Sequence, residues 1–238
     1  MNHIPYEDTH QFSSLVIDYL KSDEKLKPFI NYFPSFDNFE KQIREKNKQN
    51  IDREVLVEVL KKQNINIKLS KTSKTNIDSL LSKKTFTVST GHQTCLFTGP
   101  LYFFYKIIST LNLTEQLSAK FPNNHFVPIF WMATEDHDFE EVNKINLFGK
   151  EVIWDNSQSG AVGRMKLDRF KSVFDELSVI IGDSKRSKEL LDIFRKTYLE
   201  HAILSDATRY LINELFGKYG LVILDPDEKK LKQQIIPI

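Results

Sequence analysis

The spacing of hydrophobic residues changes at Thr85, from a polar helical texture to the apolar run TFTVS, which ends at Ser89. An apolar helical pattern follows over residues 101–117, and a second strand-like run, HFVPIFWM, occupies residues 125–132. The link between that helix and the second run is too short for another helix. Strand, helix and strand in this order predict the βαβ unit of a parallel sheet, and hence an α/β fold.

The alternation of strands and helices continues toward the end of the sequence. EVIW at residues 151–154 is strand-like, and helical spacing recurs at residues 170–181, 189–198 and 207–216. We expect Thr85–Val88, Phe126–Trp131 and Leu221–Leu224 to be strands of one parallel sheet, because parallel strands are buried on both faces and are therefore apolar throughout.

The residues before this pattern are polar, lysine-rich and free of glycine. Helical spacing is present at residues 36–49 and 53–63, whereas residues 68–84 have the composition of a linker with one short helix near Ile77–Leu81. The sequence therefore predicts a helical N-terminal segment and linker over residues 1–83 and a sheet-containing core over residues 84–238.

Composition and charge favour a small-molecule partner. The 238 residues are 40% hydrophobic and 27% charged, and 33 Lys and Arg against 32 Asp and Glu leave a net charge of +1. Such a balance gives no global attraction to nucleic acid or to an anionic membrane. The N-terminus lacks the pattern of a secretory signal, and a single cysteine fits a reducing compartment, so we expect a cytoplasmic protein.

The first candidate site is the glycine-containing turn TGHQTCLFTGP, residues 90–100, which follows the first predicted strand. In open parallel sheets ligands bind beyond the carboxyl ends of the strands, where helix N-termini favour anions. Glycine lets a phosphate or carboxylate approach the backbone closely. The candidate residues for binding substrate or phosphate are Thr90, Gly91, His92, Gln93 and Gly99. A tight structural turn is the alternative, since neither nucleotide-binding glycine pattern is matched.

The second candidate site is the acidic turn ATEDHD, residues 133–138, which follows the second predicted strand. Three carboxylates around a histidine repel one another, and such groups hold a cation, tune a base or orient an amine. The candidate catalytic residues are Glu135, Asp136, His137 and Asp138. If the two strands are parallel, these side chains lie near the glycine turn in one crevice. The alternative is the capped start of a helix.

Three classes of function are compatible with these residues. A thiol hydrolase would use Cys95 with His92 or His137, and a metal site would combine the same three side chains. Neither is favoured, because a lone cysteine is usually a small hydrophobic residue and no metal-binding motif is present. The third class is a ligase or transferase with an activated substrate. The remaining histidines, including His201, have no motif context and are expected at the surface or at helix caps.

Three long segments resemble one family in sequence order. Residues 90–109 (TGHQTCLFTGPLYFFYKIIS), 127–143 (VPIFWMATEDHDFEEVN) and 205–227 (SDATRYLINELFGKYGLVILDPD) are similar to the bacillithiol biosynthesis cysteine-adding enzymes, the BshC family. The resemblance implies a ligase that joins L-cysteine to glucosaminyl malate. It also implies a Rossmann-like core similar to nucleotidylyltransferases, and ATP or another nucleotide as cofactor. It gives no metal ligand.

The resemblance also sets expectations for assembly and for the site. Family members form homodimers through a coiled-coil arm that is absent from these 238 residues, so the core is expected to be incomplete, and a non-catalytic nucleotide-binding module is an alternative. The family commonly has glutamine at His92 and glycine at Cys95, which argues against Cys95 as nucleophile. His137 is expected to act as general base, with Asp136 or Glu135 holding the ammonium of cysteine.

Overall fold

The computed structural model describes residues 4–236, which form two compact units divided between Asn50 and Ile51. The described part of the first unit contains η1 (Tyr6–Thr9), α1 (Ser14–Leu20), η2 (Glu24–Phe29) and α2 (Phe36–Lys46). Leu26 is its only buried hydrophobic side chain among the described residues. Its helices depend on local capping: the Ser13 and Ser35 side chains accept hydrogen bonds from the backbone N–H groups of Val16 and Asn38.

The second unit is built on the predicted parallel sheet. β1 (Thr85–His92), β2 (His125–Met132) and β5 (Val222–Leu224) lie in the order β1-β2-β5, and both pairs are parallel. The α/β prediction and its three strands are confirmed. Leu221 lies just before β5, although it is as buried as the strand itself.

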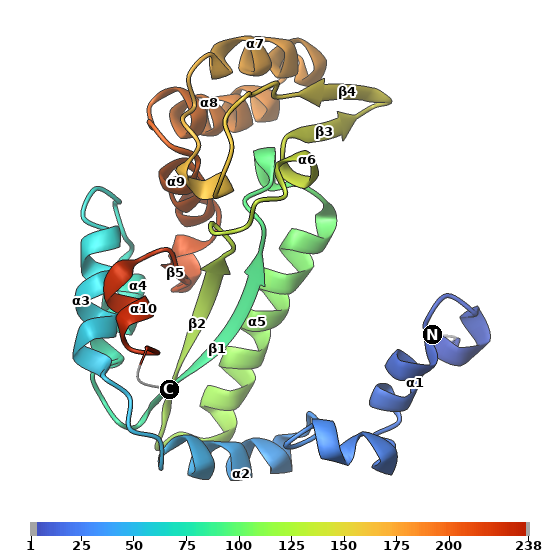
Figure 1. Cartoon of the computed structure of the whole chain (residues 1–238), viewed down its shortest axis with the longest axis vertical. Helices are drawn as coiled ribbons and strands as arrows, with labels where there is room; N and C mark the ends of the chain where they lie inside the picture. The colour runs from blue at the N-terminus through green and yellow to red at the C-terminus, as the bar shows by residue number, and fades with distance from the viewer. Residues whose placement is uncertain (1–3, 237–238) are drawn as a thin grey trace. The chain divides into compact units, whose positions relative to one another are not determined.

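Helix α5 (Leu101–Lys120) connects β1 to β2 and covers one face of the sheet (Figure 1). Phe103 and Ile107 of α5 pack against Phe130 and Met132 of β2 in a single apolar cluster. Those two helix residues are four apart and therefore share one helix face. The helix was predicted correctly, but Leu101, Tyr105 and Ile108, whose helical spacing indicated it, are exposed, so that spacing does not mark the side that meets the sheet.

Helices α3 (Arg53–Gln63) and α4 (Lys71–Ser79) cover the opposite face (Figure 1). Leu60 and Ile77 pack there against Val127 of β2. Both helices therefore belong to the second unit, and the division lies at residue 50 rather than at residue 83.

The linker expected over residues 68–84 is largely the helix α4. Its polar residues are structural: the buried Ser73 hydroxyl donates a hydrogen bond to the Gly217 carbonyl oxygen, and the Asn76 side-chain amide donates to the Gly220 carbonyl oxygen. A serine- and threonine-rich composition was typical of a linker, but here it provides donors for the chain that leads into β5.

Most of the remaining elements gather beyond the carboxyl ends of the strands (Figure 1). They are α6 (Phe139–Val142), β3 (Lys144–Leu147), β4 (Lys150–Ile153), η4 (Val162–Arg164), α7 (Phe170–Ile181), α8 (Lys185–Leu199) and α9 (Leu204–Phe216). By contrast, η5 (Gly217–Tyr219) contacts α4, and α10 (Lys229–Gln233) lies beside α3 (Figure 1). The predicted strand near EVIW is β4, which pairs with β3 in a separate antiparallel hairpin. The three helices expected here are α7, α8 and α9.

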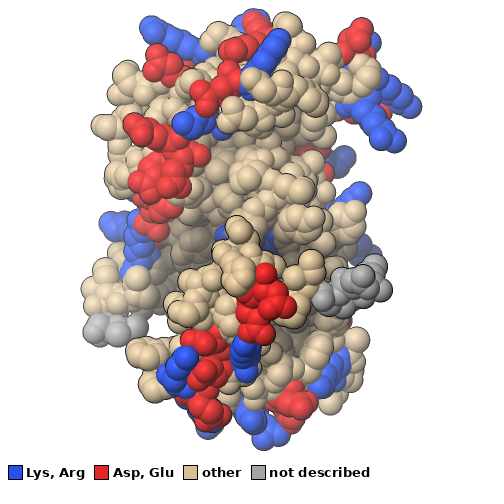
Figure 2. All heavy atoms as spheres, turned by 90° about the vertical axis from the view of Figure 1, so that its right-hand side faces the viewer, with Lys and Arg blue, Asp and Glu red and all other residues tan. Residues whose placement is uncertain are grey.

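The surface agrees with the balanced composition. Figure 2 shows basic and acidic side chains interspersed on the face that it draws, and the basic ones do not merge into a continuous stripe. A stripe of that kind is the electrostatic footprint of a nucleic-acid-binding face. Among residues 4–236, no helix combines the length and the apolar character that crossing a membrane requires.

Candidate active site at the carboxyl edge of the sheet

The glycine turn and the acidic turn leave the same edge of the sheet. β1 ends at His92 and β2 ends at Met132, its partner in the parallel register. The ladder continues by one hydrogen bond, 3.0 Å long, from the Ala133 N–H to the His92 carbonyl oxygen. The two turns therefore begin side by side, as the parallel pairing predicted.

Close packing explains both glycines of the first turn. A Cβ atom on Gly91 would lie 3.2 Å from the Trp131 carbonyl oxygen of the neighbouring strand. Gly99 has a φ of +64°, and a Cβ atom there would lie 2.6 Å from the Cβ atom of Cys95. Gly91 itself lies within β1, so its backbone is extended rather than curved around an anion. The steric demand on both positions comes from the protein itself.

A lysine that sequence reasoning did not identify reaches this turn. Lys106 of α5 donates a hydrogen bond of 2.9 Å to the Gly91 carbonyl oxygen and lies over the Tyr102 ring, 4.9 Å from its centroid. Helix α5 begins next to the same turn, so its N-terminus and the Lys106 ammonium both favour an anion there. The signal available in the sequence was a single lysine in an otherwise apolar first part of the helix.

His92 and Cys95 do not form a nucleophile and base. The Cys95 Sγ atom lies 3.9 Å from His92 Nδ1, but Nδ1 also lies 3.3 Å from the Gln93 carbonyl oxygen, which can only accept. Nδ1 therefore carries the hydrogen and cannot take the thiol proton. Burial raises the pKa of Cys95 to about 11, with the charge of Glu141 adding to the effect. Burial lowers the pKa of His92, and so does Lys106.

The acidic turn is held by the backbone of η4. The Gly163 N–H donates to the Thr134 carbonyl oxygen at 2.9 Å, and the Val162 N–H donates to the Asp136 carbonyl oxygen at 2.8 Å. A Cβ atom on Gly163 would lie 2.5 Å from the Thr134 Cβ atom, so the approach requires glycine. The backbone of the acidic turn is therefore held in place by hydrogen bonds from η4.

The side chains of the acidic turn do not converge on one another. Asp136, His137 and Asp138 are exposed, and Asp138 precedes α6 without forming a side-chain cap. Glu135 instead pairs with Lys232 of α10 at 2.5 Å. Within residues 4–236, no three His, Cys, Asp or Glu side chains are arranged to hold a metal ion. The arrangement does not support the thiol- or metal-dependent hydrolase.

A third acidic turn lies at the same edge and was not assigned a role from the sequence. Asp225 directly follows β5, and its carboxylate accepts hydrogen bonds from the Thr134 hydroxyl and, at 3.2 Å, from Arg209 Nη2. Asp227 accepts from Arg164 at 2.5 and 2.7 Å and from Lys232 at 2.8 Å.

This network changes the electrostatics of the edge. The Arg164 hydrogen bonds lower the pKa of Asp227 to about 2, and Lys232 contributes in the same direction. Lys232 bridges Asp227 and Glu135, so the ends of β2 and β5 share one set of charges. The signal in the sequence was the pair of aspartates after the last predicted strand, together with an arginine on the mostly apolar α9.

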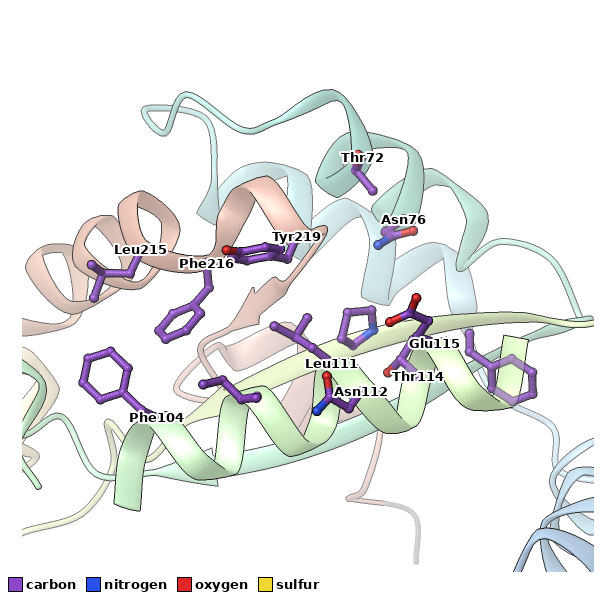
Figure 3. Close-up of a pocket in the computed structure, with 13 residues that line it drawn as sticks. Thr72, Asn76, Phe104, Leu111, Asn112, Thr114, Glu115, Leu215, Phe216 and Tyr219 are labelled. Carbon is purple, nitrogen blue, oxygen red and sulfur yellow. The ribbon is translucent and has the colours of Figure 1, made fainter. Parts of the chain in front are cut away.

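Among the cavities on the described part of this unit, two differ in where they lie relative to the turns. The larger, about 730 Å³, lies between α5 and the η5 region and is lined mostly by apolar side chains such as Phe104, Leu111 and Phe216 (Figure 3). It also includes Phe126 and Pro128, in the half of β2 farthest from the turns. The smaller, about 410 Å³, lies at the third turn. Only the smaller cavity lies at the edge where the candidate chemistry gathers.

Comparison with known proteins agrees with this architecture. A sequence model described as "Bacillithiol biosynthesis BshC, N-terminal Rossmann-like domain" matches residues 1–238. Proteins named "Putative cysteine ligase BshC" from Flavobacterium psychrophilum, Flavobacterium johnsoniae and Christiangramia forsetii are each 49% identical to this chain. The matches cover 98%, 98% and 99% of this chain and 45% of each relative, so the chain spans about half the length of those relatives. The chain belongs to the BshC family, and its residues correspond to the family's N-terminal Rossmann-like domain.

Proposed function

We propose that this chain is part of a ligase that forms an amide between the carboxyl group of L-cysteine and the amino group of glucosaminyl malate, the last step of bacillithiol biosynthesis. The observation that carries the proposal is the 49% identity, over 98% of the chain, to a relative named "Putative cysteine ligase BshC". The meeting of the glycine turn and the acidic turn at one sheet edge supports it, because ligands bind at such edges.

Amide formation needs an activated carboxyl group, because a free carboxylate is a poor electrophile. ATP or another nucleotide would supply that activation when bound. The residues at the glycine turn fit an anion: the Lys106 ammonium lies at Gly91, and the 20-residue helix α5 begins after Pro100. The role that we assign to this turn is to hold phosphate or malate oxygens.

The acidic turn would handle the amine. The sugar ammonium must lose a proton before its nitrogen attacks, and the exposed imidazole of His137 is available to accept it. Asp136 is also exposed, whereas Glu135 is already paired with Lys232. Asp136 is therefore the better of the two to hold a substrate ammonium beside His137.

The complete protein is proposed to act as a homodimer through a coiled-coil arm outside these residues. This arrangement predicts that the 238-residue chain alone does not dimerise as the longer relatives do. Sedimentation of this chain beside a complete relative distinguishes the two cases, since a dimer of the chain alone would contradict the role of the arm.

The test of the function is His137→Gln in the complete enzyme, with formation of the amide product followed by mass spectrometry. General-base catalysis typically contributes 10²–10⁴-fold, so we expect the rate at saturating substrate to fall by about 100-fold or more. The matched control is His10→Gln, since His10 is also exposed but lies in the first unit. Equal rates for the wild type and His137→Gln would exclude His137 as the base, and absence of amide product from the wild type would refute the ligase.

A further inference from the structure

The cavity of about 410 Å³ at the end of β5 has polar walls from three parts of the chain. Gln63 comes from the end of α3, Asp225 follows β5, and Ser205 lies in the first turn of α9. The residues that line it belong to the second unit. The cavity is therefore formed within one compact body, at the edge of the sheet where ligands of parallel sheets bind.

One wall of the cavity offers donors for an anion. Helix α9 begins at Leu204, and its N-cap residue, Ile203, supplies no side-chain hydrogen bond. Among the described contacts, the backbone N–H groups of Ser205 and Asp206 have no acceptor. The first N–H groups of a helix carry partial positive charge, and this 13-residue helix leaves them open beside the cavity.

Arg209, one turn further along α9, is the second and independent observation. Its side chain is only 6% exposed, although the residue lines the cavity. Nη1 donates to Asp206 at 2.9 Å and Nη2 donates to Asp225 at 3.2 Å, whereas the buried Nε atom has no described partner. The Nε atom is closed off from the cavity, so what Arg209 offers a ligand is the positive charge of its guanidinium at the wall, which favours an anionic group there.

His201 contributes an acceptor on the same cavity. Its Nδ1 atom lies 3.0 Å from the carbonyl oxygens of both Lys196 and Thr197. Carbonyl oxygens only accept, so Nδ1 carries the hydrogen, and in the neutral ring Nε2 is left as an acceptor. His201 also lines the cavity, so an imidazole nitrogen with a free lone pair is available to a ligand amine.

The balance of charge determines which class of ligand fits. Three cations and four carboxylates line the cavity, which leaves one negative charge in excess when His201 is neutral. The cations are Lys62, Arg164 and Arg209, and the carboxylates are Asp206, Asp225, Asp227 and Glu228. A polyphosphate would be repelled by this excess. A ligand with a carboxylate and an ammonium on neighbouring atoms would meet charges of opposite sign at both ends.

We propose that this cavity binds the zwitterion of an α-amino acid, with its carboxylate at the N-terminus of α9 and its ammonium against Asp206 and His201. The inference rests on the proposed function for the identity of that amino acid, which is L-cysteine. The groups of the α-carbon are recognised in the same way for any side chain, so the cavity itself stands independently of which amino acid is used.

The first experiment measures binding to the 238-residue chain by calorimetric titration under reducing conditions. The ligands are L-cysteine, cysteamine, which lacks the carboxylate, and N-acetyl-L-cysteine, which lacks the ammonium. We expect saturable binding of L-cysteine. The affinity of each analogue should be lower by roughly 10-fold or more, because a hydrogen bond to a charged group contributes about 1.5–3 kcal/mol. Analogues that bind as tightly as L-cysteine would overturn the proposal.

The second experiment compares Asp206→Asn with Asp192→Asn. Each aspartate pairs with an arginine three residues later, at 2.9 Å for Asp206 and 3.2 Å for Asp192, and their side chains are 51% and 50% exposed. We expect Asp206→Asn to weaken L-cysteine binding by about 10-fold and Asp192→Asn to leave it unchanged. His201→Gln provides a second variant that removes the acceptor, and circular dichroism verifies the fold.

Each outcome decides the proposal. Equal affinities of Asp206→Asn, His201→Gln and the wild type would overturn it, as would the absence of saturable binding by the folded wild-type chain. If glycine, L-serine and L-cysteine bind equally well and depend on Asp206, the cavity is confirmed and cysteine as the preferred substrate is not. The failure of the cavity and the failure of the proposed ligase are thus separate results.

Discussion

The glycine turn after β1 and the acidic edge after β2 and β5 lie at the same end of one sheet, yet they differ in electrostatic character. At the glycine turn burial favours the neutral forms of Cys95 and His92, by raising the pKa of the thiol and lowering that of the imidazole, and the Lys106 ammonium is the charged group. At the acidic edge, by contrast, carboxylates form ion pairs: Asp225 pairs with Arg209, and Asp227 pairs with Arg164.

This difference indicates which groups are able to transfer protons. A neutral thiol of high pKa and an imidazole whose Nδ1 hydrogen points to a carbonyl oxygen form a packed wall. The acidic edge has exposed side chains on a backbone that η4 holds in place. We infer that the glycine turn sets the shape of this edge of the sheet, whereas the acidic edge sets its charge.

The largest effect is expected for Asp225→Ala, which removes the central carboxylate of the acidic edge. Arg209 would keep Asp206 but lose its buried partner, and breaking a buried ion pair typically costs about 3–5 kcal/mol of unfolding free energy. Urea denaturation measures the loss. The control is Asp192→Ala, an exposed pair for which we expect less than about 1 kcal/mol. Equal losses would show that the edge is not a coupled network.

The next effect concerns the reactivity of Cys95 toward iodoacetamide. Its pKa is raised from 9.0 to about 11, so below both values the thiolate fraction falls by about 100-fold, and alkylation should slow by about the same factor. The internal control is the same chain unfolded in urea, in which the thiol is solvated. Equal alkylation rates in the folded and unfolded chains would contradict a buried neutral thiol at this turn.

A smaller effect separates steric demand from backbone conformation. Gly99 and Gly149 both have positive φ, +64° and +78°. A Cβ atom would have neighbouring atoms within 4 Å at Gly99 but none at Gly149. We expect Gly149→Ala to cost about 1 kcal/mol from its positive φ. Gly99→Ala should cost about 2 kcal/mol more, because its ψ of −147° with positive φ is essentially restricted to glycine and because the new methyl group overpacks against Cys95. In a Cys95→Gly background the overpacking part should disappear and the backbone part should remain. A loss that is unchanged there would mean that Cys95 is not what crowds Gly99.

The sequence was sufficient to predict the sheet because its signal is local. Two apolar runs separated by one helical run, with a link too short for a second helix, predict parallel pairing, and the pairing places Gly91 beside Trp131. The role of α4 could not be predicted in the same way. Ser73 and Asn76 are buried by hydrogen-bond partners 144 residues away in the sequence, and composition alone indicated a linker here.

The candidate site was predicted in part for the same reason. Residues at strand ends were placed at one edge, but the direction of each side chain depends on tertiary partners. Glu135 pairs with Lys232, and His201 faces the cavity at the third turn because the Lys196 and Thr197 carbonyl oxygens orient its ring. Sequence spacing carries no information about contacts of this kind.

The smallest effect is the pH dependence contributed by Asp227, whose pKa falls from 3.8 to about 2 in the folded chain, chiefly through its Arg164 hydrogen bonds. A carboxyl group whose pKa is lower in the folded chain stabilises the fold at pH values above its unfolded pKa of 3.8. That stabilisation is lost as the pH falls toward the folded pKa of about 2.

Asp227→Asn removes this contribution. The unfolding free energies of wild type and variant should therefore differ by about 1 kcal/mol near neutral pH and converge as the pH falls to the folded pKa of Asp227. The expected difference is modest because the Arg164 side chain is 70% exposed and the pair is screened by solvent. Unfolding in urea at a series of pH values measures it, and added salt should reduce it further. A difference that stays constant as the pH falls would mean that Asp227 acts through its shape or its hydrogen bonds rather than its charge. The acidic edge would then resemble the glycine turn, where packing rather than ionisation determines the structure.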